Sequence, residues 1–170
     1  MLKAMRERTS QEEGFTLIEL MVVVLIIAVL VAIAIPSFLG FRVSAQDRAA
    51  QTVLRNGVLA QKGYWTDNQG YASTQANLSS FETSIVVGTD TVGEIEIPYL
   101  NNATAGGEDT VCMQSPSDSG NSFGVYIASA NPEEYNSSND STVDLCDGSG
   151  QVTGNAAHGT WTTGGFPAVP

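Results

Sequence analysis

The sequence predicts an α+β protein in which a long N-terminal hydrophobic helix packs, along its C-terminal half, against a small antiparallel β-sheet head. Three observations predict this fold: an apolar run without charge, an amphipathic helical pattern after it, and short β-rich runs in the rest of the chain. The expected parts are a leader peptide at 1–14, a hydrophobic membrane-spanning helix at 15–41, its amphipathic continuation at 42–66, and a β-rich head with a disulfide loop at 67–170.

The uncharged run from Leu20 to Phe41 contains 22 residues. As a helix it would be about 33 Å long at ~1.5 Å per residue, which matches a hydrocarbon core of ~30 Å. Glu19 stands at the edge of this run, where an unpaired charge in a membrane would cost roughly 2.5 to 3.5 kcal/mol, so the carboxylate requires a partner. A cut after Gly14 would supply one, because it would leave an α-ammonium on Phe15 with a pKa of about 8.

The residues around that bond, Gly14-Phe15-Thr16-Leu17-Ile18-Glu19-Leu20, resemble the class III leader site of the type IV pilins and their pseudopilin relatives. Ala34-Ile35-Pro36 resembles the segment where the pilin helix bends, and beyond Phe41 the likeness is loose. The resemblance implies that prepilin peptidase cuts after Gly14 and that Phe15 becomes the N-methylated mature start. It also implies that Glu19 neutralises the Phe15 amine of a neighbouring subunit during assembly.

Two other interpretations of the N-terminus compete with this one. The first is an ordinary secretory signal, with residues 1–14 as its n-region and Ala32-Ile33-Ala34 as its cleavage site. Against it, the leader has no net charge, a carboxylate stands at the start of the apolar run, and the run is longer than the usual 7 to about 15 residues. The second is a simple membrane anchor, which explains the length of the run but gives Glu19 no role.

The helix is expected to change character along its length. Pro36 lacks an amide donor and crowds the carbonyl four residues before it, so a kink or local melting is expected near 32–36. Farther on, a set of apolar residues at helical spacing predicts the face that packs on the head: Val43, Ala50, Leu54, Val58 and Trp65. The sequence Asp67-Asn68-Gln69-Gly70 is expected to end the helix.

Beyond Gly70 the composition of the chain is typical of strands and loops. Short runs rich in β-branched and aromatic residues, separated by Gly, Asn, Ser and Pro, predict strands. These runs are Ile85 to Val87, Glu94 to Tyr99, Thr110 to Met113, Phe123 to Ala130 and Thr142 to Cys146. Ser115 to Asn121 and Asn131 to Ser141 are expected to be polar loops, and in Gly148 to Pro170 only Trp161 and Phe166 are expected to act as anchors.

The formal net charge is −11, and the surplus lies in the head, because no Lys or Arg follows Lys62 whereas 13 Asp and Glu do. Such a head is not expected to bind nucleic acid by neutralising phosphates. Three cations of the helix, Arg48, Arg55 and Lys62, recur every seven residues and share one face. This face is either simply solvated or a charge-pairing stripe that meets acidic neighbours.

Few residues suggest site chemistry. Cys112 and Cys146 lack C-x-x-C spacing, so in an exported head we expect a disulfide between them rather than a metal or redox site. Three aspartates are candidates for a Ca²⁺ site, although their spacing does not match an EF-hand loop and a solvated negative surface is the preferred interpretation: Asp140, Asp144 and Asp147. His158 is the single histidine, and no catalytic motif occurs, so no enzyme activity, metal or cofactor is expected.

The resemblance implies a structural subunit of a type IV pilus, with adhesion, motility or DNA uptake as the role of the filament. The alternative is a minor pilin or a type II secretion pseudopilin. A pseudopilin head usually carries a C-terminal calcium loop that this sequence does not match, whereas the Cys pair resembles that of pilins. The implied partners are identical subunits, prepilin peptidase, the inner-membrane assembly platform, and the membrane before assembly. The implied location is the cytoplasmic membrane for the precursor and the bacterial cell surface for the filament.

Overall fold

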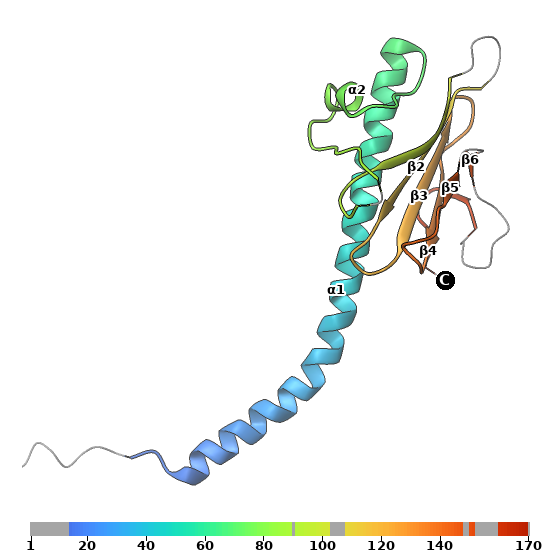
Figure 1. The fold of residues 1–170 in the computed structure, drawn as a ribbon. Helices are drawn as coiled ribbons and strands as arrows, with labels where there is room; N and C mark the ends of the chain where they lie inside the picture. Colours follow the sequence, from blue (N-terminus) through green and yellow to red (C-terminus); the bar gives the residue numbers. More distant parts are fainter. Residues whose placement is uncertain (1–13, 90, 103–107, 148–149, 152–159, 170) are drawn as a thin grey trace, which may run out of the picture. The chain divides into compact units, whose positions relative to one another are not determined.

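The computed structural model describes residues 14–89, 91–102, 108–147, 150–151 and 160–169. The chain comprises two units, Met1–Phe41 and Arg42–Pro170. Within the described residues the helices are α1 (Leu17–Asn68) and α2 (Gln75–Ser79), and the strands are β1 (Glu96–Asn101), β2 (Thr110–Pro116), β3 (Ser122–Ala128), β4 (Glu134–Ser138), β5 (Cys146–Asp147), β6 (Gly150–Gln151) and β7 (Thr162–Thr163) (Figure 1). These elements confirm the predicted α+β class.

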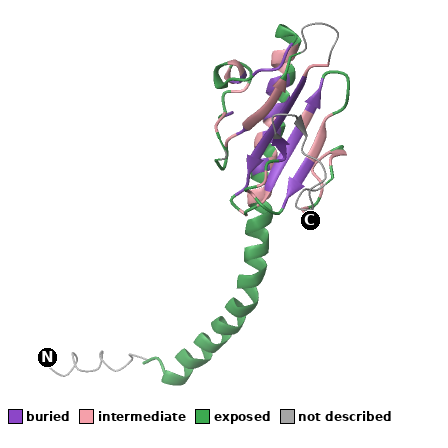
Figure 2. Ribbon diagram, turned by 45° about the vertical axis from the view of Figure 1, so that its right-hand side comes forward, coloured by how far each residue is buried: buried purple, intermediate pink, exposed green. Residues whose placement is uncertain are grey.

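The first part of α1 is not buried by the rest of the chain. Every residue in 17–45 is exposed (Figure 2). The helix continues through Pro36 without interruption, so the local melting considered for 32–36 is not observed, and a kink at Pro36 stays a prediction. Because an exposed apolar surface of this size is unfavourable in water, this part of the helix requires lipid or protein around it.

The second part of α1 packs on the head through one face. Ala50, Leu54 and Val58 are buried, as their spacing predicts, whereas Val43 is 43% exposed and does not belong to this face. Trp65 is half-buried at the edge of the core. The helix ends at Asn68, where the predicted stop signal lies, and the next residue adopts a left-handed φ of 52°.

Gly57 lies where α1 approaches the sheet most closely. A Cβ at this position would be 2.6 Å from Ile95 Cδ1 and 3.4 Å from Met113 Sδ. Glycine inside a helix costs about 1 kcal/mol relative to alanine. The close packing of the helix on the core explains why the sequence carries this residue despite its cost.

Side-chain amides hold the chain that follows α1. Gln61, fully buried in α1, donates to the Ala72 carbonyl and accepts from the Ala72 amide, each at 2.8 Å. Asn102 makes the same pair of bonds with Tyr71, donating at 3.0 Å and accepting at 2.8 Å. These side chains replace a neighbouring strand as partners for the backbone, so its polar groups are satisfied without a sheet.

Five strands form one antiparallel sheet in the order β1-β2-β3-β4-β7, and β5 pairs separately with β6. The predicted small antiparallel sheet is therefore confirmed. The strands expected at Glu94 to Tyr99, Thr110 to Met113 and Phe123 to Ala130 are present as β1, β2 and β3, with ends that differ by at most three residues.

The polar loop expected at Asn131 to Ser141 was wrong, because this segment contains β4. Its residues pair in register with β3, with Gly124 opposite Asn136 and Val125 opposite Tyr135. Asn136 and the two serines after it are fully buried. This strand is stabilised by its backbone hydrogen bonds to β3 and by the part of the chain that covers it, rather than by apolar side chains of its own. The polar composition of the segment therefore predicted a loop incorrectly.

Two predicted strands were also wrong. In the run Thr142 to Cys146, the Asp140 carboxylate accepts hydrogen bonds from Thr142 and forms a turn, so pairing begins only at Cys146. The run Ile85 to Val87 makes a single bridge, from Val87 to Ile95. The Gln75 side chain bonds the Ile85 carbonyl and the Val87 amide, which a neighbouring strand would otherwise pair.

Alternation along the strands gives the sheet two buried faces. The residues that form the core with α1 are Val111 and Met113 of β2 and Phe123, Val125 and Ile127 of β3. The residues that alternate with these along β2 and β3 point away from α1, and the C-terminal part of the chain covers them. At Gly124, a Cβ would lie 2.9 Å from Leu145 Cβ and 3.3 Å from Trp161 Cη2, so this cover sits directly on the sheet.

The C-terminal tail (160–169) passes around the β4 edge of the sheet. The Trp161 ring meets the Tyr126 ring at 6.4 Å between centroids, β7 then pairs with β4, and Phe166 contacts the rings of Phe123 and Tyr135 at 5.5 and 4.9 Å. The expectation that Trp161 and Phe166 anchor this part of the chain is confirmed. They do so on opposite faces of one sheet.

Candidate functional site

The predicted processing segment lies ahead of α1. Phe15 is 77% exposed, and a Cβ added at Gly14 would meet no atom within 4 Å. Residues 1–13, the rest of the predicted leader, lie outside the described residues. Because nothing in the described fold requires a glycine at position 14, any requirement for it lies with the processing enzyme; cleavage and N-methylation stay predictions.

Thr16 and Glu19 form a capping box at the start of α1. The Thr16 amide and hydroxyl donate to Glu19 Oε2 at 3.0 and 2.7 Å, and the Glu19 amide donates to Thr16 Oγ1 at 3.3 Å. These bonds satisfy amides that a helix N-terminus leaves open, and they place the carboxylate at the positive end of the helix dipole. Sequence reasoning missed this partner of Glu19, although Thr-x-x-Glu before an apolar run is the signature of the motif.

Cleavage after Gly14 would leave the capping box intact. Only the nitrogen of Phe15 becomes an amine, so the Thr16 amide keeps its proton. Both Thr16 bonds go to Oε2 of Glu19, and no described residue bonds Oε1. The predicted pairing of Glu19 with the Phe15 ammonium of a neighbour would therefore use an oxygen that the chain's own fold leaves available.

The apolar surface of α1 follows directly after the capping box. By length and composition, α1 is able to cross a membrane. Exposed fractions of its large side chains are high, for example 65% for Met21 and 64% for Leu25. A helix that is apolar on all sides fits lipid and fits the packed interior of an assembly, because both remove it from water.

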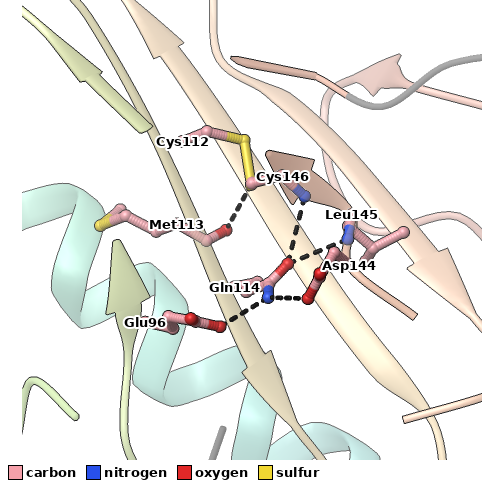
Figure 3. The surroundings of a disulfide bond; sticks show 7 residues. All are labelled: Glu96, Cys112, Met113, Gln114, Asp144, Leu145 and Cys146. Carbon is pink, nitrogen blue, oxygen red and sulfur yellow. Dashed lines mark hydrogen bonds between the residues drawn. A yellow bond between two sulfur atoms is a disulfide. The ribbon is translucent and has the colours of Figure 1, made fainter. Parts of the chain in front are cut away.

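The predicted disulfide between Cys112 and Cys146 is confirmed. It joins β2 to β5 across a sequence separation of 34, and both cysteines are fully buried (Figure 3). Cys146 Sγ also contacts the Met113 carbonyl oxygen at 3.5 Å, without a hydrogen to donate because it belongs to the disulfide. The bond fixes the C-terminal part of the chain to the middle of the sheet.

Gln114 holds the same segment by hydrogen bonds (Figure 3). Its Oε1 accepts from the Leu145 amide at 2.9 Å and from the Cys146 amide at 3.1 Å. Its Nε2 donates to Glu96 Oε2 at 2.6 Å and to Asp144 Oδ1 at 3.0 Å. All four hydrogen-bonding positions of the amide are thus used. Sequence reasoning missed this residue, and no local pattern marks it.

The candidate calcium ligands bind other groups. Asp140 Oδ1 accepts from the Thr142 hydroxyl at 2.7 Å and from its amide at 2.9 Å, and these bonds, the hydroxyl foremost, lower the pKa of the Asp140 carboxyl. Asp144 accepts from Gln114, and the side chain of Asp147, like the whole of His158, lies outside the described residues. Among the residues that the structure describes, no group of three or more His, Cys, Asp or Glu could hold a metal ion.

The three cations at seven-residue spacing differ in their surroundings. Lys62 forms an ion pair with Glu133, and the guanidinium carbon of Arg55 lies 5.5 Å from the centre of the Phe166 ring. Arg48 is exposed and has no ionic partner among the described residues. This helix face is therefore neither wholly solvated nor wholly available to neighbouring subunits, because two of its three cations contact residues of the same chain's head.

Comparison with known proteins gives a match of residues 9–35 to the family model of the prokaryotic N-terminal methylation motif. The chain is 46% identical over 68 residues to the type IV wide pilus major component of Thermus thermophilus, covering 40% of this chain and 52% of that protein. It is 44% identical over 62 residues to the type IV major pilin protein of Myxococcus xanthus, covering 36% and 28%. It is 39% identical over 74 residues to the type II secretion system core protein G of Pseudomonas aeruginosa, covering 41% and 49%. The chain thus spans about half or less of the length of these curated relatives.

The motif match and the fold agree with the resemblance drawn from the sequence. The matched residues include Gly14, Phe15 and Glu19, and the helix that follows packs through its second part on a five-stranded antiparallel sheet. The Thermus and Myxococcus relatives are named as a pilus component and a major pilin, which are structural proteins rather than enzymes. Residues 9–35 of the chain thus carry the prokaryotic N-terminal methylation motif, and the described residues have a pilin-like α+β fold.

Proposed function

We propose that the chain is the structural subunit of a type IV pilus, held in the cytoplasmic membrane as a precursor and polymerised into a surface filament after processing. The observation that carries this proposal is the exposure of every residue in 17–45, a segment that begins inside the methylation motif matched at 9–35. Lipid before assembly and a packed filament core afterwards both remove this surface from water. The similarity to a wide pilus component of Thermus and to a major pilin of Myxococcus supports the same function.

In this proposal, processing and assembly both take place at the first helical turn. Prepilin peptidase cleaves the bond between Gly14 and Phe15, and the new Phe15 amine is methylated. At the inner-membrane assembly platform, Oε1 of Glu19 accepts from the Phe15 ammonium of an adjacent subunit. The low dielectric of the filament core strengthens this charged bond relative to water. The extracellular filament supports adhesion, motility or DNA uptake, and its acidic heads do not bind nucleic acid directly.

Mass spectrometry of filaments sheared from producing cells tests the proposal. The dominant chain should begin at a methylated Phe15. Gly14→Leu should leave the precursor uncut in the membrane. Gly40→Leu should be cut normally, because Gly40 is another exposed glycine at which an added Cβ meets nothing within 4 Å. A mature N-terminus at Ile35 would establish the secretory-signal interpretation and overturn the proposal.

A second candidate function is that of a type II secretion pseudopilin. The similarity to core protein G of Pseudomonas aeruginosa favours it. Deletion of the chain separates the two candidates: loss of surface filaments supports the pilus subunit, whereas loss of protein secretion with filaments unchanged supports the pseudopilin. A minor pilin would be found in sheared filaments at a small fraction of the total protein.

A further inference from the structure

The face of α1 directed away from the core carries an exposed row of residues. Its members follow one another at spacings of three or four, so they form one narrow stripe along the helix, called here the outer stripe: Arg48, Thr52, Arg55, Leu59, Lys62 and Thr66. Leu59 lies in the middle of the stripe. It is 70% exposed, more than any other large hydrophobic side chain described beyond residue 41.

The two threonines of the outer stripe already have hydrogen-bond partners. Thr52 Oγ1 donates to the Arg48 carbonyl at 2.7 Å, and Thr66 Oγ1 donates to the Lys62 carbonyl at 2.8 Å. Such bonds to the preceding turn satisfy both hydroxyl protons inside the helix. The surroundings of Leu59 can therefore be dehydrated without leaving a threonine hydroxyl proton unpaired, which lowers the cost of covering this helix face.

Charge complementarity indicates what covers the stripe. Arg55 and Lys62 engage the chain's own Phe166 and Glu133, which leaves Arg48 as the stripe's cation without an ionic partner among the described residues. The head presents the opposite charge. Two exposed carboxylates there have no cationic partner among the described residues: Asp140 and Asp144. One molecule thus carries two complementary patches at different places.

We infer that the outer stripe is the docking surface for the acidic head of a second copy of this chain. Leu59 is buried at the centre of this contact, and Arg48 pairs with one of the second copy's exposed carboxylates. A contact between two different patches is heterologous, and heterologous contacts that do not close into a ring build a helical filament. The inference rests on the proposed filament function and adds which head residues hold neighbouring subunits together.

Carbodiimide cross-linking of filaments tests the Arg48 contact. Arg48→Lys keeps the charge and places at position 48 an amine that the reagent can join to a carboxylate in direct contact. Denaturing gels should show subunit dimers, and peptide mapping should trace them from position 48 to Asp140 or Asp144. Lys62, the one lysine after residue 14, should react within its own chain with Glu133 and so serves as the internal control. Filaments that give the Lys62 product but no link from position 48 to another subunit overturn the inference.

Leu59→Ala gives an independent test. The ratio of filament to membrane-bound subunit should fall roughly tenfold, as expected when a large apolar side chain is removed from the centre of an interface. Val86→Ala is the matched control, because Val86 is 46% exposed and lies outside the stripe. Thermal unfolding of the head should be unchanged in both variants. Wild-type yield from Leu59→Ala refutes the contact, whereas absence of filaments from the wild type refutes the proposed function itself and the contact with it.

Discussion

Replacement of Gln114 by methionine should destabilise the head by about 2 to 6 kcal/mol. Methionine keeps nearly the same length and volume but cannot accept from the amides of Leu145 and Cys146, both of which belong to fully buried residues. Each buried amide left without an acceptor costs about 1 to 3 kcal/mol. The bonds from Gln114 to Glu96 and Asp144 add little, because Glu96 is only half-buried and Asp144 is exposed, so water can solvate both carboxylates.

Urea unfolding of the full chain in detergent, followed by the fluorescence of Trp65 and Trp161, measures this loss. The disulfide still ties the segment to β2, so the native state should form and the midpoint of unfolding should move to lower urea. Gln51→Met is the control, because Gln51 makes no side-chain hydrogen bond to any described residue; its effect should stay within about 0.5 kcal/mol. An equally small effect of Gln114→Met would refute the reasoning, since another acceptor would then have replaced the amide.

Thr16→Ala should remove the cap of α1, at a cost of about 1 kcal/mol in helix stability, and still permit filaments. Glu19→Ala as the only copy should remain in the membrane without forming filaments, and normal filament yield would contradict the proposed pairing. Thiol labelling of the folded chain should modify neither Cys112 nor Cys146, and reduction should lower the unfolding free energy of the head by roughly 3 to 4 kcal/mol in the chain-entropy model. Burial, and secondarily two neighbouring carboxylates, raise the pKa of Tyr71 to about 12. Because the unfolded chain loses this proton near pH ~10, stability should fall as pH rises from there toward the folded pKa, and Tyr71→Phe should make that fall shallower.

The elements that sequence reasoning predicted correctly are those set by local periodicity or local turn chemistry. The spacing of Ala50, Leu54 and Val58 identified the buried face of α1, because an apolar helix face is stable only when another part of the protein covers it. The stop after Asn68 follows from residues that favour turns. The capping box of Thr16 and Glu19 was equally local and could have been predicted from its spacing alone.

The features that sequence reasoning missed depend on partners far along the chain. β4 is polar in sequence, and its partners lie far along the chain: Ser137 Oγ is 3.4 Å from the carbonyl oxygens of Pro167 and Ala168 in the tail. Gln114 matters only because Asp144, Leu145 and Cys146 return to it after about 30 residues. Within a short stretch of sequence, nothing distinguishes a glutamine with buried hydrogen bonds from a glutamine exposed to water. The same holds for Gln61, whose two bonds go to Ala72.

Moving α1 from the membrane into a filament raises an energetic problem that the described contacts help to resolve. Lipid tails are as apolar as the side chains of the apolar segment, so the transfer gains little from the hydrophobic effect. The free energy of assembly must then come from packing and from contacts that exist only between subunits. Among the described residues, Glu19 Oε1 accepts no hydrogen bond, Arg48 has no ionic partner, and Leu59 of the outer stripe is 70% exposed, so these groups are available for this purpose. Variants that lose these groups but keep the apolar segment should accordingly accumulate in the membrane as folded subunits.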